Sequence, residues 1–295
     1  MSKKKVLVVG STGQVGGQVV NKLQQLAGDV EVVVSSRRQA QVDDWKAQGR
    51  NAVLLDLDEP RTFGTALAGV DSVFMLTGYT VDMLVQSKTL TDAAVKAGVQ
   101  HMVHWGVFHN PDVTDPHFAW HQMVETYIAA SGLKWTNLHP NYFMENLVNV
   151  TQIKNNRFSI YSGDARWGWI ALEDAAEVAA IVLRDGAEKH HGKDYWLSTE
   201  SLNGVEAAAI LTKALGTEIT CDVRPASELE EFFNSGAVDV EPNYAASGVE
   251  VMRQIQDGRM AYLGTVRDDV PHVTGRAALT LEDWAMKNRT ALLGE

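Results

Sequence analysis

A glycine-rich segment at residues 10–16 constrains the fold of this chain more than any other stretch. It reads Gly10-Ser-Thr-Gly13-Gln-Val-Gly16 and follows the continuous apolar run Val6–Val9. Valine and leucine then recur at positions 15, 19, 23 and 26, which is one face of a helix. A buried strand, a glycine turn and an amphipathic helix in this order predict the start of a βαβ unit, and Gly28-Asp29 is expected to close the helix.

Each glycine of this turn has a physical role in phosphate binding. One permits the tight turn, one lets the backbone approach a pyrophosphate, and one lets helix and strand pack closely. The start of the helix then offers free N–H groups and a positive dipole end. We therefore expect a bound dinucleotide to contact Gly10, Thr12, Gly13, Gln14, Val15 and Gly16. A glycine turn without a ligand is the alternative interpretation.

Strand and helix patterns alternate along the first half of the chain. Strands are expected at 30–34, 52–55, 72–76, 101–105 and 135–138, and helices at 39–48, 60–68, 83–96 and 118–130. This alternation predicts the α/β class, as a Rossmann-type doubly wound parallel sheet.

The rhythm loosens after residue 145. Helices are expected at 172–184, 202–215, 227–234, 248–257 and 281–293, and strands at 195–198 and 218–223. We interpret residues 1–145 as the dinucleotide-binding domain. Residues 146–295 are interpreted as a smaller α/β region that completes the fold and caps a substrate pocket.

The end of the second strand bears on the choice of dinucleotide. Proteins selective for NAD usually place an acidic residue there, whereas this chain reads Ser35-Ser36-Arg37-Arg38. A guanidinium suits a 2′-phosphate, so the pattern favours NADP(H) over NAD(H), with Ser36 and Arg37 as contacts. A solvated basic pair is the alternative. Asp56 and Leu57, after the third strand, would bracket the adenine, although Asp56 could equally cap a helix.

Composition excludes several classes of partner. The formal net charge of -11 over 295 residues repels nucleic acid and anionic membranes. The apolar run after the basic start is too short for an export signal, and no stretch approaches a membrane-spanning length. The single cysteine, Cys221, suits a reducing cytoplasm. We expect a cytoplasmic protein with a small-molecule substrate; the sequence leaves its oligomeric state open.

These features resemble the short-chain dehydrogenase/reductase superfamily, and more closely its atypical NmrA-like branch. The likeness rests on the glycine turn, on the Pro140–Asn146 stretch Pro-Asn-Tyr-Phe-Met-Glu-Asn, and on Glu173-Asp-Ala-Ala-Glu-Val-Ala179. Members of the branch are reductases of quinones and other small carbonyl or unsaturated compounds, or NADP(H)-responsive regulators. The resemblance implies cofactor contacts at Leu76, Thr77, Gly78, Gly106 and Val107, and contacts near the nicotinamide at Pro140, Asn141 and Phe143.

The catalytic pattern of the superfamily is missing. Its members use a serine and a tyrosine followed four residues later by lysine, but none of the seven tyrosines here has that lysine. The matching segment reads His117-Phe-Ala-Trp-His121, and Gly106 takes the place of the serine. One interpretation is an oxidoreductase in which His117 and His121 handle the proton, since histidine has a pKa near ~6.5. The other is a non-catalytic NADP(H) sensor with a structural histidine pair.

Two further groups of residues are candidates for a metal site and for the substrate pocket. His109, Asp112, Asp115, His117 and His121 are legitimate ligand types, but they match no known spacing, so no metal is predicted. Trp105, which ends the fifth strand where ligands collect, and Tyr142 are expected to line the substrate pocket.

Overall fold

The computed structural model describes residues 3–26, 30–235 and 240–294, and its centre is a parallel sheet of seven strands in the order β10-β6-β5-β4-β1-β2-β3. These strands are β1 (Lys4–Val8), β2 (Val30–Ser36), β3 (Ala52–Leu54), β4 (Ser72–Met75), β5 (His101–Trp105), β6 (Lys134–Pro140) and β10 (Lys193–Leu197). The strand order reverses between β1 and β4, which confirms the doubly wound fold. Ligands of such sheets collect at the carboxyl ends of the strands flanking this point.

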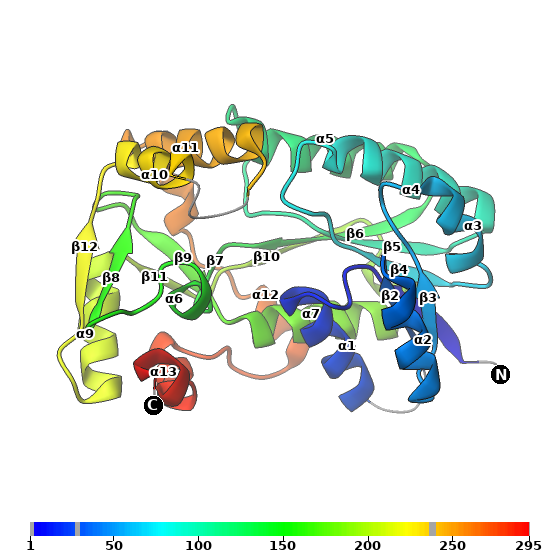
Figure 1. The fold of residues 1–295 in the computed structure, drawn as a ribbon, viewed down its shortest axis with the longest axis horizontal. Coiled ribbons are helices and arrows are strands. Elements are labelled where there is room, and N and C mark those ends of the chain that lie inside the picture. The colour runs from blue at the N-terminus through cyan, green and yellow to red at the C-terminus, as the bar shows by residue number, and fades with distance from the viewer. Residues whose placement is uncertain (1–2, 27–29, 236–239, 295) are drawn as a thin grey trace.

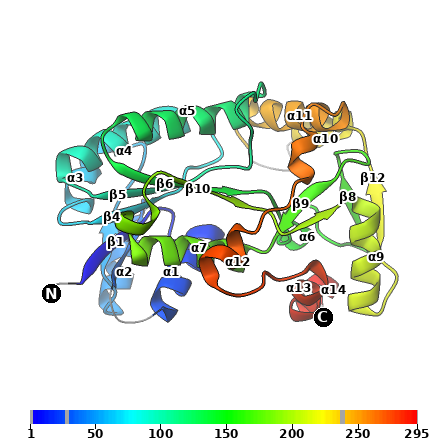
Figure 2. The same cartoon turned by 180° about the vertical axis from the view of Figure 1, so that it is seen from behind.

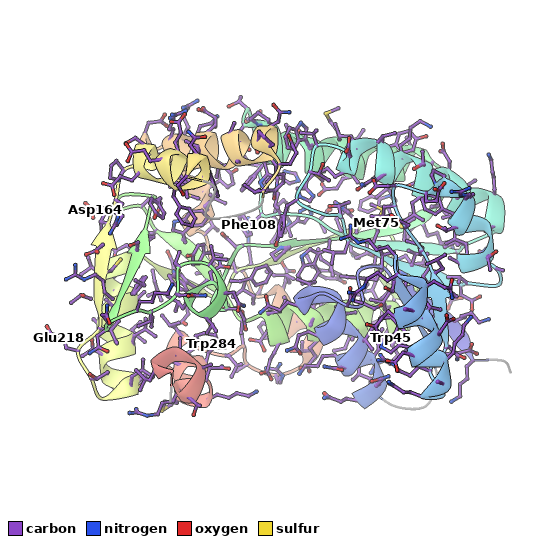
Figure 3. All side chains as sticks on the ribbon, in the orientation of Figure 1. Trp45, Met75, Phe108, Asp164, Glu218 and Trp284 are labelled. Atoms are coloured by element: carbon purple, nitrogen blue, oxygen red, sulfur yellow. The ribbon has the colours of Figure 1, made fainter. Side chains whose placement is uncertain are left out.

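Helices cover both faces of the central sheet (Figures 1 and 2). One face carries α1 (Gln14–Gln25), α2 (Gln39–Ala47), α7 (Leu172–Asp185) and α12 (Asp269–Thr274); the other carries α3 (Phe63–Ala66), α4 (Met83–Ala97) and α5 (Pro116–Ala130). Successive residues of a strand point to opposite faces, so Val6 and Val8 join one core and Leu7 the other. Trp45 and Met75, labelled in Figure 3, belong to these two cores.

The second half of the chain builds a further core beside the carboxyl ends of the central strands, and Phe108 and Trp284 both belong to it (Figure 3). Its strands form two small sheets, β11-β9-β7 and β12-β8. These strands are β7 (Tyr142–Phe143), β8 (Arg157–Ile160), β9 (Trp167–Ile170), β11 (Glu200–Leu202) and β12 (Thr220–Val223). Its helices are α6 (Asn146–Asn149), α8 (Ala187–His190), α9 (Gly204–Leu215), α10 (Ala226–Asn234), α11 (Pro242–Gln256), α13 (Leu281–Lys287) and α14 (Arg289–Leu293).

Short 3-10 turns lie at η1 (Pro60–Thr62) and η2 (Ala261–Gly264). No helix within the described ranges is both long and apolar enough to cross a membrane.

Several expected elements differ from those observed. The helix expected at 281–293 is interrupted at Asn288, which separates α13 from α14. The helix expected from residue 248 already begins at Pro242, because the Glu241 carboxylate caps its first N–H groups. Strands β8 and β9 were not anticipated, and the expected close of α1 at Gly28-Asp29 lies outside the described residues.

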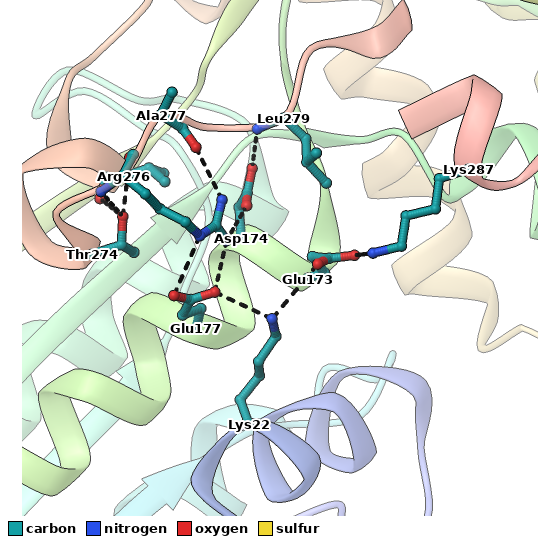
Figure 4. Close-up of polar contacts among 10 residues, drawn as sticks. Lys22, Glu173, Asp174, Glu177, Thr274, Arg276, Ala277, Leu279 and Lys287 are labelled. Atoms are coloured by element: carbon teal, nitrogen blue, oxygen red, sulfur yellow. Dashed lines mark hydrogen bonds and ion pairs between the residues drawn. The ribbon is translucent and has the colours of Figure 1, made fainter. Parts of the chain in front are cut away.

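Charged side chains fasten the C-terminal segment to α7 and α1 (Figure 4). The fully buried carboxylate of Asp174 receives the Arg276 guanidinium at 2.6 Å and the Leu279 N–H at 2.7 Å. Glu177 pairs with the same guanidinium at 2.7 Å and with Lys22 of α1 at 3.2 Å. A buried carboxylate needs such partners, so this network fixes the chain returning past α7.

Candidate functional site

The glycine turn joins β1 to α1 with almost no free space. Gly10 has a φ of +71°, which side-chain-bearing residues rarely adopt, and a Cβ there would lie 2.9 Å from Leu76 Cδ2. A Cβ on Gly16 would lie 2.3 Å from the Gly10 carbonyl oxygen, which is shorter than any tolerated contact. The first turn of α1 therefore packs directly on the turn backbone, as the spacing of the glycines predicts.

Two serines hold this turn against the neighbouring strands. Ser11 Oγ donates to the Val8 carbonyl at 2.6 Å and accepts the Ser35 N–H at 3.0 Å. Ser35 Oγ donates to the same carbonyl at 2.9 Å, so β1, the turn and β2 form one unit. Helix α1 begins at Gln14 with no side-chain cap and no acidic residue in its first turn. Its first N–H groups and positive dipole end are thus available to an anion.

The end of β2 brings the two arginines next to this turn, because β2 pairs directly with β1. Ser36 is buried, and its hydroxyl accepts the Arg38 N–H at 3.1 Å. Arg37 and Arg38 are exposed, and no carboxylate in the described part of the chain forms an ion pair with either. Beyond β3, Asp56 Oδ1 accepts the Asp58 N–H at 3.1 Å, so Asp56 caps a turn and not a helix.

Gly106 lies under the carboxyl end of β5 in space that a side chain cannot share. A Cβ there would lie 2.7 Å from Glu125 Oε1 and 3.3 Å from His104 Cε1. A side chain at position 106 would therefore collide with the Glu125 carboxylate and the His104 ring. Gly106 can offer only backbone groups to a ligand, and Val107 can offer an apolar surface.

A cavity of about 670 Å³ opens at the carboxyl ends of β5 and β6. Helices α10 and α11 close it on the far side, and its walls are mainly apolar and aromatic. Its lining includes Val107, His117, Pro140, Asn141, Tyr142, Tyr161, Trp167 and Tyr244. Thr77, Gly78 and Phe143 are not among the residues that line it.

Trp105 is not a pocket residue, which corrects the expectation from its place at the end of β5. Its side chain is 5% exposed and points into the core shared with α7. It stacks on Phe143 with ring centroids 6.0 Å apart and meets the edge of Phe74 at 5.6 Å. Strand alternation decides this, since the side chain at position 105 shares its face with Val103. Tyr142, in contrast, lines the cavity.

The two histidines of α5 occupy different places. His117 lines the cavity, and its Nε2 lies 2.9 Å from the hydroxyl of Tyr244 on α11. His121 is 6% exposed and lies behind it, with ring centroids 5.3 Å from His117 and 5.6 Å from His104. Burial lowers the pKa of His117 to about 4 and that of His121 well below its usual value. Neither imidazolium is populated at pH 7, so the expected pKa near 6.5 is wrong for both.

Two buried histidines, His109 and His139, form a network with the half-buried Glu125 and the exposed Asp194 beneath the same strand ends. Glu125 Oε2 lies 3.0 Å from His109 Nε2, and Asp194 lies 3.1 Å from His139 Nε2. His109, Glu125 and His139 place ligand-type atoms within 4.8 Å of one another. Both nitrogens of each imidazole already face acceptors, however, since the Nδ1 atoms contact the carbonyls of Asn110 and Val107. The arrangement is that of a hydrogen-bonded network.

The metal-type residues of the 109–121 segment do not converge. Asp115 is buried and caps α5 by accepting the Phe118 N–H at 2.9 Å. His109 turns toward Glu125 while His117 faces the cavity. Tyr244 is a cavity residue that the sequence analysis does not identify. It is separated by 127 positions from the histidine it contacts, and no local motif marks it.

Comparisons with known proteins agree with this fold. The model of the NmrA-like family matches residues 2–264. The NAD(P)H azoreductase of Xenophilus azovorans is 30% identical over 291 residues, which cover 97% of this chain and 98% of that protein. Quinone oxidoreductase 2 of Escherichia coli is 26% identical over 73% of this chain and 76% of its own length. The triphenylmethane reductase of Citrobacter sp., solved with NADP(H), superposes with a TM-score of 0.81 at 21% identity, covering 97% of this chain and 100% of that one.

Proposed function

This chain belongs to the NmrA-like family, and we propose that it is an NADP(H)-dependent oxidoreductase acting on a small carbonyl, quinone or azo compound. The observation that carries the proposal is the position of the apolar cavity. It opens at the carboxyl ends of β5 and β6, on the same edge of the sheet as the switch point between β1 and β4, where doubly wound sheets bind their ligands. The cofactor supplies a hydride when bound, and a cavity of this size admits an aromatic substrate beside it.

The residues near the carboxyl ends of the strands suit successive parts of the cofactor. The turn at Gly10–Gly16 and the open start of α1 suit the pyrophosphate, because the glycines expose backbone there and no side chain caps the first N–H groups. Arg37, exposed and without an ion-pair partner in the described ranges, suits the adenosine 2′-phosphate. Asp56 and Leu57 would flank the adenine.

The nicotinamide end of the cofactor would lie beside the segments that follow β4, β5 and β6. Thr77, Gly78, Gly106 and Val107 would line the path of the cofactor, and Pro140, Asn141 and Phe143 would approach the ring. Asn141 is held rigidly, since its Nδ2 donates to the Leu263 carbonyl at 2.8 Å. Residues 146–295 would supply most of the substrate walls, through Trp167 and helices α10 and α11.

His117 and His121 would serve different ends. His117 lines the cavity and can meet the substrate. His121 is buried behind it, so we assign it to positioning His117. Hydride transfer needs chiefly that donor and acceptor be held together, so the missing tyrosine–lysine pair does not preclude it.

A two-step experiment on the full chain tests the proposal. Calorimetry is expected to detect NADPH binding that is tighter than NADH binding. Loss of NADPH absorbance is then followed with a series of quinones, azo dyes and aldehydes. Turnover of at least one supports an oxidoreductase. Tight NADPH binding without turnover of any would favour the sensor, and absence of nucleotide binding would overturn both.

A further inference from the structure

A tyrosine–histidine pair forms part of the cavity wall. Tyr244 lies in the first turn of α11, where the Glu241 carboxylate accepts its N–H at 3.1 Å and fixes the backbone. Its hydroxyl lies 2.9 Å from His117 Nε2, and the two rings pack with centroids 4.7 Å apart. Both residues line the cavity together with Val107 and Asn141. The pair therefore faces the space proposed for the substrate.

Tyr244 also meets the loop proposed to line the cofactor. Its ring lies 5.5 Å from that of Tyr79, which follows β4 in sequence. The cavity wall holds two other tyrosines, Tyr142 and Tyr161. Of the three, Tyr244 is the one whose hydroxyl has an imidazole within hydrogen-bonding distance in the described residues. Tyr142 is instead paired with the side chains of Thr151 and Asn146.

We propose that Tyr244 donates the proton that accompanies substrate reduction, and that His117 stabilises the phenolate left behind. The inference rests on the proposed oxidoreductase function. Reduction of a carbonyl, quinone or azo bond adds a hydride to one atom and leaves an electron pair on oxygen or nitrogen. The Tyr244 O–H bond breaks and its proton bonds to that oxygen or nitrogen. The phenolate left behind accepts a hydrogen bond from His117 Nε2–H. A solvent proton then restores the hydroxyl.

The electrostatics of the pair set the protonation state of both groups. Burial raises the pKa of Tyr244 and lowers that of His117 to about 4, so both groups are neutral at pH 7. Tyr244 therefore keeps its proton until a strong base forms beside it. A neutral imidazole with its proton on Nε2 donates to the phenol oxygen and leaves the phenolic hydrogen free to face the cavity. Protonation thus follows hydride arrival.

Two substrates that differ in their need for a proton test the proposal. A quinone needs a hydride and a proton, whereas a cationic triarylmethane dye becomes neutral by accepting hydride alone. Tyr244→Phe is expected to slow quinone reduction by about 100-fold and to leave dye reduction within about twofold of wild type. Tyr127→Phe is the matched control, because its hydroxyl bonds Asp92 on the outer side of α5, away from the cavity. It should change neither rate.

Each other outcome has a stated meaning. Equal slowing of both substrates, or of neither, would overturn the donor role of Tyr244. If the wild type reduces only the quinone, the solvent isotope effect on quinone reduction is compared between the two proteins. The effect should be smaller in the wild type than in Tyr244→Phe, or absent. Equal effects would reject the proposal. Nitrogen-15 NMR gives a readout without turnover, since the His117 Nε2 resonance should move in Tyr244→Phe. Wild type that reduces nothing refutes the proposed function, while the NMR result still reports on the pair.

Discussion

A Cβ on Gly16 would lie 2.3 Å from the carbonyl oxygen of Gly10, so the first turn of α1 rests directly on the turn that precedes it. Gly17, the next residue, differs sharply: a Cβ there would lie 3.7 Å from the Ser11 carbonyl oxygen, an ordinary contact. Substituting Gly16 and Gly17 in turn therefore distinguishes a position that requires glycine from one that tolerates an added methyl group.

Gly16→Ala is expected to push α1 away from the turn. Overpacking of this kind lowers the free energy of unfolding by about 1–3 kcal/mol, and we expect NADPH affinity to fall by at least about tenfold. Gly17→Ala should retain affinity and gain up to about 1 kcal/mol, because alanine favours a helix. Urea unfolding and calorimetry measure both quantities. Equal behaviour of the two variants would contradict the packing argument.

Arg37→Ala tests the assignment of the 2′-phosphate. Loss of a charge-assisted hydrogen-bonded pair costs about 2 kcal/mol, so NADPH should bind about 30-fold more weakly while NADH binding barely changes. Arg61→Ala is the control, since this exposed arginine pairs with Glu59 at 2.7 Å. Calorimetric titration with both nucleotides gives the comparison. A similar loss for NADH and NADPH would remove Arg37 from this role.

His104→Leu should make the protein less sensitive to acid. Burial lowers the pKa of His104 to about 4, so between this value and ~6.5 the unfolded chain binds a proton that the folded protein does not. Stability is therefore lost as the pH falls through that window. Without His104, the slope of unfolding free energy between pH 5 and 6 should decrease by about 1 kcal/mol per pH unit.

The same variant is expected to keep or gain stability at pH 7, because both ring nitrogens of His104 are buried without a hydrogen-bond partner in the described residues. His272→Leu, at an exposed position, serves as the control and should leave the slope unchanged. Urea titrations at several pH values measure the slopes. An unchanged slope in His104→Leu would show that this imidazole is already protonated or solvated.

Arg276→Met tests the network of Figure 4. It would leave the fully buried Asp174 carboxylate with the Leu279 N–H alone, at a cost of about 3 kcal/mol in unfolding free energy. Arg259→Met, which breaks a pair with the half-exposed Asp257, should cost less than about 1 kcal/mol. Equal costs, measured by urea unfolding, would mean that Asp174 finds another partner.

Local sequence was sufficient for the first half of the fold. Glycine spacing and apolar periodicity act within a few residues, and they placed the turn at residues 10–16 on its strand and helix. The same logic failed for Trp105, because the face of a strand residue depends on which helix covers that face, here α7 from beyond residue 170. It located β10, expected at 195–198 and observed at Lys193–Leu197, but not its pairing with β6, which lies more than fifty positions earlier.

The sequence by itself determined the class of fold, the glycine turn and the basic end of β2, because each depends on the chemistry of adjacent residues. Tertiary structure alone decided the cavity and its polar groups. It set Tyr244 against His117 across 127 positions, and it placed Glu125 in the space that a side chain at position 106 would need. Burial then shifted the histidine pKa values, and burial is a property of the packed chain that no local pattern encodes.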